Sequence, residues 1–160
     1  MLELNRISAG YGKQTVLDGI SVDFEKGKLT SIIGVNGCGK STLLKAILGI
    51  LSLSNGEIFI DGENLLTISR NEIAKKIAYL SQGKNIPDMT VEQMVLHGRF
   101  PYLSYPRRYS SHDREVAIKA MEAVGIAEFA HKPLYSLSGG MRQNAYIAMA
   151  LAQDTDYILL

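Results

Sequence analysis

The chain has 160 residues, of which 46% are hydrophobic and 21% charged, so it can form one globular domain with a buried core. Its formal net charge of +1 argues against a nucleic-acid-binding protein that relies on a basic surface, and its one cysteine excludes an internal disulfide framework. The longest predominantly apolar run, residues 46–53, is much shorter than the roughly 20 residues that a membrane span needs. We therefore expect no membrane span and no signal peptide in this sequence, so that any role at a membrane goes through a partner.

The first part of the chain carries the pattern strand, glycine loop, helix. Residues 2–8 alternate like an edge strand, and residues 22–24 look like its partner. Residues 29–33 are apolar and β-branched, which predicts a central strand. A glycine-rich turn follows, and residues 40–51 carry apolar side chains at helical spacing.

Short strands and a capped helix are predicted next. Residues 57–60 alternate before a turn, and residues 77–80 form another strand-like run. Between them, Ser69 and Glu72 form a capping box, which predicts a short helix that runs to about Lys76.

The following stretch changes character. Thr90 and Gln93 form a second capping box and predict the start of another helix. Residues 99–112 are rich in Tyr, Pro, Arg and Ser and predict a long loop, whereas residues 113–124 predict an amphipathic helix. We therefore expect residues 88–135 to form a mainly helical subdomain inserted into an α/β core.

Residues 34–41 match the pattern G-x-x-x-x-G-K-[ST] without exception. Glycines let the backbone approach phosphates closely, and successive N–H groups together with the N-terminus of the next helix form an anion site. Lys40 would reach the β- and γ-phosphates, and the Ser41 hydroxyl would bind Mg²⁺. The alternative is a glycine-rich turn without a ligand. The loop predicts ATP and Mg²⁺ as cofactors, bound by Gly34, Asn36, Gly37, Cys38, Gly39, Lys40 and Ser41, with Cys38 contributing its backbone N–H.

These segments predict the α/β class, with a P-loop NTPase core made of a parallel sheet with antiparallel edge strands, and an inserted helical subdomain. The last four residues, 157–160, form an apolar run typical of a buried central strand of a parallel sheet. We expect the chain to be truncated at its C-terminus. The alternative is a short natural protein whose C-terminal strand docks onto the sheet.

A second anion site is predicted near the end of the chain. Ser138, Gly139 and Gly140 precede a run, residues 141–153, in which alanines recur at helical spacing. The exposed N–H groups and the dipole at the start of this helix favour an anion. The residues alone leave open an ordinary serine cap followed by flexible glycines.

Four motifs together resemble the ATP-binding-cassette family in their order and spacing. They are Tyr11 with Gly12, the loop 34–42, Gln82 after a strand, and Leu-Ser-Gly-Gly at 137–140. The resemblance implies that a second subunit joins in a head-to-tail dimer with two ATP molecules sandwiched between the subunits. It implies that Ser138, Gly139 and Gly140 clasp the γ-phosphate of the ATP held by the other subunit.

The resemblance also assigns roles near the phosphate loop. It implies that Tyr11 stacks on adenine and that Thr42 assists at the phosphates. Gln82 would touch Mg²⁺ or the attacking water, so that Lys40 and Gln82 are the expected catalytic residues and Ser41 and Gln82 the expected metal contacts. The alternatives are a strand-edge aromatic for Tyr11 and a polar cap for Gln82.

The sequence departs from the family pattern at three places. Met141 stands where the family has Gln and Asn144 where it has Arg, which we expect to weaken but not abolish engagement of the other subunit's nucleotide. The family's next strand ends in Asp-Glu, one residue for Mg²⁺ and one for the general base, but the sequence ends at Leu160. We therefore expect inefficient hydrolysis by these residues alone. The resemblance divides the chain into a nucleotide-binding core (1–87), the helical subdomain (88–135), and the signature helix with the start of the Walker B strand (136–160).

Residues 98–102, 105–109 and 146–154 resemble the importers of iron–siderophore complexes, haem and cobalamin. This implies an ATP-binding subunit, peripheral on the cytoplasmic face of the cell membrane, that powers import through an integral-membrane permease. The aromatic and arginine residues after Gln82 are expected to be exposed and to face the permease, the alternative being a solvated loop. Competing hypotheses are a soluble cassette ATPase acting on DNA or ribosomes, and an inactive nucleotide-binding module.

Overall fold

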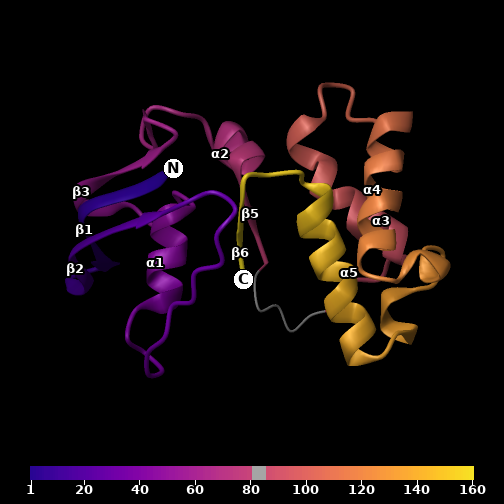
Figure 1. Ribbon diagram of the computed structural model, residues 1–160, viewed down its shortest axis with the longest axis horizontal. Helices are drawn as coiled ribbons and strands as arrows, with labels where there is room; N and C mark the ends of the chain where they lie inside the picture. The colour runs from indigo at the N-terminus through magenta and orange to yellow at the C-terminus, as the bar shows by residue number, and fades with distance from the viewer. Residues whose placement is uncertain (81–85) are drawn as a thin grey trace. The chain divides into compact units, whose positions relative to one another are not determined.

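Figure 1 shows a computed structural model of the chain, which describes residues 1–80 and 86–160. The chain forms two compact units, Met1–Lys76 and Ile77–Leu160, named here the N-terminal unit and the C-terminal unit. Strands and helices occur in both, which confirms the predicted α/β class. The predicted boundaries at 87/88 and 135/136 stay a prediction.

The N-terminal unit is built on a four-stranded sheet in the order β2-β1-β3-β4. All neighbouring strands in it are antiparallel. β1 and β2 are longer than the strands predicted over residues 2–8 and 22–24. Most β2 side chains are exposed, so side-chain alternation does not mark this strand, but backbone hydrogen bonds to β1 still form along it. The strands are β1 (Leu2–Tyr11), β2 (Gln14–Phe24), β3 (Leu53–Ile60) and β4 (Glu63–Asn64).

Helix α1 (Lys40–Ile47) follows the glycine-rich loop and contacts β1 and β2 (Figure 1). The prediction that it runs to residue 51 is wrong. Gly49 adopts φ +65°, and its N–H donates to the Ala46 carbonyl at 3.0 Å while the Ile50 N–H donates to the Lys45 carbonyl at 2.9 Å. These two bonds form a Schellman motif, which uses a left-handed glycine to end the helix although apolar residues continue.

The strand predicted over residues 29–33 is absent from the structure. These residues lie outside every strand, and Leu29 and Ile33 are 96% and 93% exposed. Composition gives a run only a preference for extended backbone, whereas a strand also needs a neighbouring edge to bond with. Neither described sheet includes this run.

Helix α2 (Arg70–Lys76) starts where its capping signal predicts. The Glu72 N–H donates to Ser69 Oγ at 3.2 Å. This local bond satisfies a backbone donor that the first turn of a helix leaves unpaired.

The C-terminal unit combines a two-stranded parallel sheet with three helices that lie side by side (Figure 1). Strand β5 (Ile77–Tyr79) pairs with β6 (Tyr157–Leu159), so the last apolar residues do form a strand. The three α-helices are α3 (Val91–Leu96), α4 (Ser111–Ala123) and α5 (Gly139–Ala152). Short 3-10 helices lie between them, namely η1 (His97–Tyr102), η2 (Ala127–Phe129) and η3 (Leu134–Ser136).

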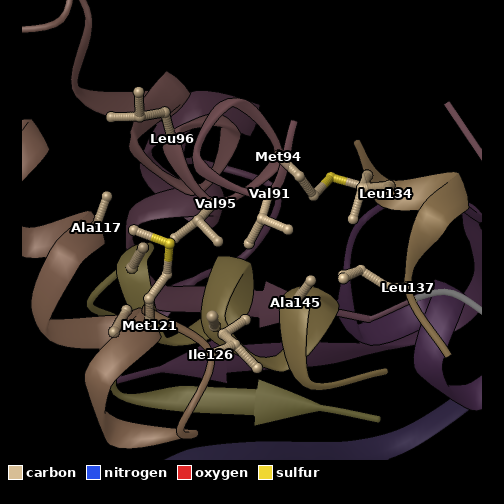
Figure 2. Close-up of a cluster of buried hydrophobic side chains, with 13 residues drawn as sticks. Val91, Met94, Val95, Leu96, Ala117, Met121, Ile126, Leu134, Leu137 and Ala145 are labelled. Atoms are coloured by element: carbon tan, nitrogen blue, oxygen red, sulfur yellow. The ribbon is translucent and has the colours of Figure 1, made fainter. Parts of the chain in front are cut away.

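A buried apolar cluster holds α3, α4 and α5 together. Figure 2 shows Val91 and Val95 from α3, Met121 from α4 and Ala145 from α5 directed toward one another. All four side chains are at most 1% exposed. Small alanines on α5 let the three helices approach closely, and burial of the larger side chains supplies the stabilisation.

Capping boxes set the starts of α3 and α4. The predicted box at Thr90 is complete, since its side chain accepts the Gln93 N–H and the Gln93 side chain accepts the Thr90 N–H. A second complete box, from Ser110 to Asp113, starts α4 at Ser111, two residues before the predicted start. The Ser-x-x-Asp spacing of residues 110–113 is the sequence signal for this start. No helix in residues 1–80 and 86–160 has the length and apolar character needed to cross a membrane.

Candidate functional site

Glycine is required by the backbone at two positions of the loop before α1 and gives close packing at a third. Gly37 and Gly39 have φ of +83° and +98°, a left-handed region that side chains disfavour. At Gly34, a Cβ would lie 2.6 Å from the Cys38 sulfur. The predicted glycine pattern therefore corresponds to a tight backbone path that leads directly into the first turn of α1.

Lys40 folds back over this loop. Its Nζ donates to the Gly34 carbonyl at 2.7 Å and the Val35 carbonyl at 2.9 Å, and lies 3.8 Å from Cys38 Sγ. In the described parts of the chain, no carboxylate forms an ion pair with Lys40. The ammonium thus provides a positive charge at the loop that an anion can neutralise.

The first turn of α1 provides further groups for an anion. No side chain caps this end of the helix, and the first turn carries no acidic residue. The backbone N–H groups of this turn and the exposed Ser41 hydroxyl can therefore bind an anion or its counter-ion. Thr42 is buried, and Asn36 in the loop is exposed. The glycine path, the hydroxyl, and a lysine that has no carboxylate partner in the described residues fit the polyphosphate of a nucleotide with its Mg²⁺.

Tyr11 lies close to α1. It ends β1 beside the turn that leads into β2, and the residue is 49% exposed. Lys45 Nζ donates to the Tyr11 hydroxyl at 3.4 Å and lies 5.6 Å from the ring centroid. Hydrogen bonding by Thr42, and to a lesser degree by Lys45, lowers the pKa of the Tyr11 phenol. The structure therefore brings together Tyr11 and the helix that starts at the loop.

The turn at residues 138–140 begins α5. Ser138 caps the helix, with its Oγ accepting the Met141 N–H at 3.3 Å. A Cβ at Gly139 or Gly140 would meet nothing within 4 Å, and neither residue has a positive φ. Nothing within the described structure therefore requires glycine here, while the bare backbone leaves room for a close approach from outside.

The family of this chain is shown by a family model that matches most of its length. The family model described as ABC transporter matches residues 17–160. This chain belongs to the ABC transporter family. The match spans the glycine-rich loop and the turn that begins α5.

Relatives of this ABC transporter chain are named as ATP-binding proteins of import or transport systems. The petrobactin import ATP-binding protein FpuD of Bacillus anthracis is 42% identical, covering 99% of this chain and 59% of FpuD. The ferric enterobactin transport ATP-binding protein FepC of Escherichia coli strain K12 is 41% identical, covering 97% of this chain and 58% of FepC.

The fold is also that of a solved ABC transporter. The inward-facing structure of a metal-chelate type ABC transporter superposes with a TM-score of 0.83 and 29% identity, covering 98% of this chain and 58% of that chain. The chain thus spans 58–59% of the length of these three proteins.

Arg99 corrects one prediction for this ABC transporter chain. The composition of residues 99–112 predicts that Arg99 is exposed on a loop, but Arg99 lies in η1 and is 5% exposed. Its Nε donates to Asp113 Oδ1 at 3.0 Å, and its Nη1 donates to the Ala152 carbonyl at 3.0 Å. A buried charge is tolerated only with such partners, so Arg99 links η1, the start of α4 and the end of α5.

Gly98 and Tyr102, on either side of Arg99, also hold η1 against the end of α5. A Cβ at Gly98 would lie 2.2 Å from the Met149 carbonyl, so η1 can approach α5 only with glycine there. The Tyr102 hydroxyl donates to the Gln153 carbonyl at 2.9 Å, and Arg99 stacks on its ring at 4.0 Å. The Gly-Arg segment that resembles the chelate importers therefore holds the end of α5.

The structure describes two of the three remaining positions that the family resemblance singles out. Met141 packs against the apolar cluster of the C-terminal unit, and Asn144 Nδ2 donates to the Val124 carbonyl at 3.1 Å, at the end of α4. Their effect on nucleotide engagement stays a prediction. Gln82 lies outside the described residues.

Proposed function

We propose that this chain is the ATP-binding part of an importer for an iron chelate of the siderophore type, and that it powers transport through a membrane permease from the cytoplasmic face. The names of the relatives support the cargo class, since FpuD and FepC are named for petrobactin import and ferric enterobactin transport. The observation that carries ATP binding is the Lys40 ammonium, held inside a glycine loop and without a carboxylate partner in the described residues.

The residues of the N-terminal unit would act on the nucleotide as follows. The backbone N–H groups of residues 36–41 and the Lys40 ammonium hold the phosphates, and Ser41 supplies a hydroxyl ligand for Mg²⁺. Thr42 stands next to Ser41 at the start of the helix, and Tyr11 offers a ring to the base. Bound ATP supplies the phosphoanhydride bond whose hydrolysis drives transport.

The turn at residues 138–140 would act on a second copy's nucleotide. The N–H groups at the start of α5 and the two glycines without Cβ atoms suit a phosphate approaching from outside. We therefore propose a head-to-tail dimer of ATP-binding subunits. Within residues 1–160, we also propose slow hydrolysis, because Asp154 and Asp156 precede β6 and no carboxylate follows it.

Replacing Lys40 tests the ATP site. The Lys40→Ala variant is expected to lose ATP affinity by roughly 10- to 100-fold, since hydrogen bonds to a charged group are removed from the phosphates. Calorimetric titration of Mg-ATP measures this loss. Lys28→Ala, which removes an exposed lysine of the same unit, is the control. Equal affinity in wild type and Lys40→Ala would refute the assignment.

The exposed residues after η1 are proposed to contact the permease. Arg107 stacks on the Phe100 ring at 4.5 Å, and Tyr105 is 96% exposed. Such aromatic and arginine side chains are enriched at the centres of protein interfaces. The surface thus has the composition of a docking site.

Charge reversal at this surface tests the contact. The pair Arg107→Glu/Arg108→Glu is expected to reduce co-purification of the permease by about tenfold. It is expected to leave ATP affinity unchanged, because neither arginine is among the residues proposed to bind the nucleotide. The matched control is Lys119→Glu/Lys132→Glu, two exposed lysines of the same unit. Cross-linking of the permease to residues 55–65 instead would show that the assignment is wrong.

A further inference from the structure

Lys45 is the residue at this site to which neither the loop pattern nor the family resemblance gives a role. It lies in the last turn of α1 and its side chain is only partly buried. A lysine in the last turn of a helix ordinarily interacts with the helix dipole and is otherwise solvated. Here its ammonium instead reaches the Tyr11 phenol at 3.4 Å.

The contact fixes an exposed ring. Tyr11 is half exposed, so its own packing restrains its side chain little. The Lys45 ammonium bonds the hydroxyl and lies 5.6 Å from the ring centroid, which opposes rotation of the side chain away from α1.

The same helix carries the phosphate-binding groups. Lys40 and Ser41 form its first turn, and Lys45 follows roughly 7 Å further along the axis, at about 1.5 Å per residue. An α-helix is stiff over this length, so the ring and the phosphate groups are held at a set separation. A ligand with a phosphate chain at one end and an aromatic base at the other would contact both.

We propose that Lys45 is a positioning residue of the nucleotide site, which holds the Tyr11 ring beside α1 and so favours ligands that carry a base. This inference rests on the proposed ATP binding. In this proposal Lys45 acts on the ligand through Tyr11 and not through the phosphates. Its loss therefore affects a nucleotide but not inorganic tripolyphosphate.

Paired titrations on the full chain test the proposal, with Mg-ATP and Mg-tripolyphosphate as the two probes. Lys45→Gln is expected to weaken ATP binding about three- to tenfold, a part of what base–aromatic stacking supplies, and to leave tripolyphosphate binding unchanged. Tyr11→Phe, which keeps the ring but removes the hydroxyl, is expected to act alike. The double variant should lose no more ATP affinity than either single variant, because both changes remove the same contact between Lys45 and the Tyr11 hydroxyl.

Two controls separate positioning from charge and from folding. Lys45→Arg keeps a cation with hydrogen-bond donors and is expected to restore ATP affinity to within about twofold. Lys13→Gln removes an exposed lysine from the turn next to Tyr11 and is expected to have no effect. Thermal unfolding of each variant shows that the titrations are made on folded protein.

Several results would overturn the inference. Equal weakening of ATP and tripolyphosphate would make Lys45 a phosphate ligand or a folding residue, and additive losses in the double variant would make the two side chains independent. Wild-type ATP affinity in Lys45→Gln would overturn this inference and leave the proposed function intact. A wild-type chain that binds neither probe would overturn both.

Discussion

The Arg99→Ala variant is expected to lower the free energy of unfolding of the C-terminal unit by about 3–5 kcal/mol, the usual cost of removing one partner from a buried ion pair. The Asp113 carboxylate would remain buried without its cation, and the Ala152 carbonyl would lose its donor. The loss also affects the start of α4, since Asp113 is half of its capping box. Urea denaturation of the full chain, followed by circular dichroism, measures the change.

An exposed ion pair provides the control for Arg99. Arg114 pairs with Glu92 at 3.1 Å with its own side chain 55% exposed, so Arg114→Ala should cost no more than about 1 kcal/mol. Arg99→Lys should fall between the two, because lysine cannot reproduce both directed bonds of the guanidinium. Equal costs for Arg99→Ala and Arg114→Ala would contradict the structural role assigned to Arg99.

The contribution of the buried pair depends on pH in a defined direction. Burial raises the pKa of Asp113, but hydrogen bonds from Ser110 and Arg99 outweigh it, so the pKa of this carboxyl is lowered. A group whose pKa is lower in the folded state stabilises the fold above its unfolded pKa, here about 4, and loses that contribution as the pH falls through the folded value. The difference between wild type and Arg99→Ala should therefore shrink below about pH 4.

The polypeptide of residues 1–160 is expected to bind ATP but to hydrolyse it about 10²- to 10⁴-fold more slowly than a chain extended by the Asp-Glu pair that the family resemblance implies after β6. That factor is the usual contribution of a positioned general base. Asp154 and Asp156 cannot replace the pair, because they lie before β6, at the other end of the strand. The first added carboxylate would also support Mg²⁺.

Steady-state phosphate release from the two chains, at equal ATP occupancy, measures this difference. An extension that ends in Asn-Gln keeps the length and the shape of the side chains but removes both carboxylates. It should therefore release phosphate as slowly as residues 1–160. Equal rates for the unextended and the Asp-Glu chain would mean that the carboxylates are not the catalytic groups.

The sequence by itself determined the features that depend on neighbours within a few residues. The glycine loop at residues 34–41 was predicted from its pattern, because positive φ values at Gly37 and Gly39 are requirements of the backbone at those positions. The serine cap at Ser69 and the capping box at Thr90 were predicted for the same reason, since each joins a side chain to an N–H three residues away.

Only the tertiary structure decided the features that depend on distant partners. Arg99 had the composition of an exposed loop residue, but it is buried because Asp113 and the end of α5 supply bonds from 14 and 53 residues away. Residues 29–33 had the composition of a central strand but are not one, because a strand requires an adjacent edge. The contact between Tyr11 and Lys45 joins residues that are 34 positions apart, and no sequence pattern predicts it.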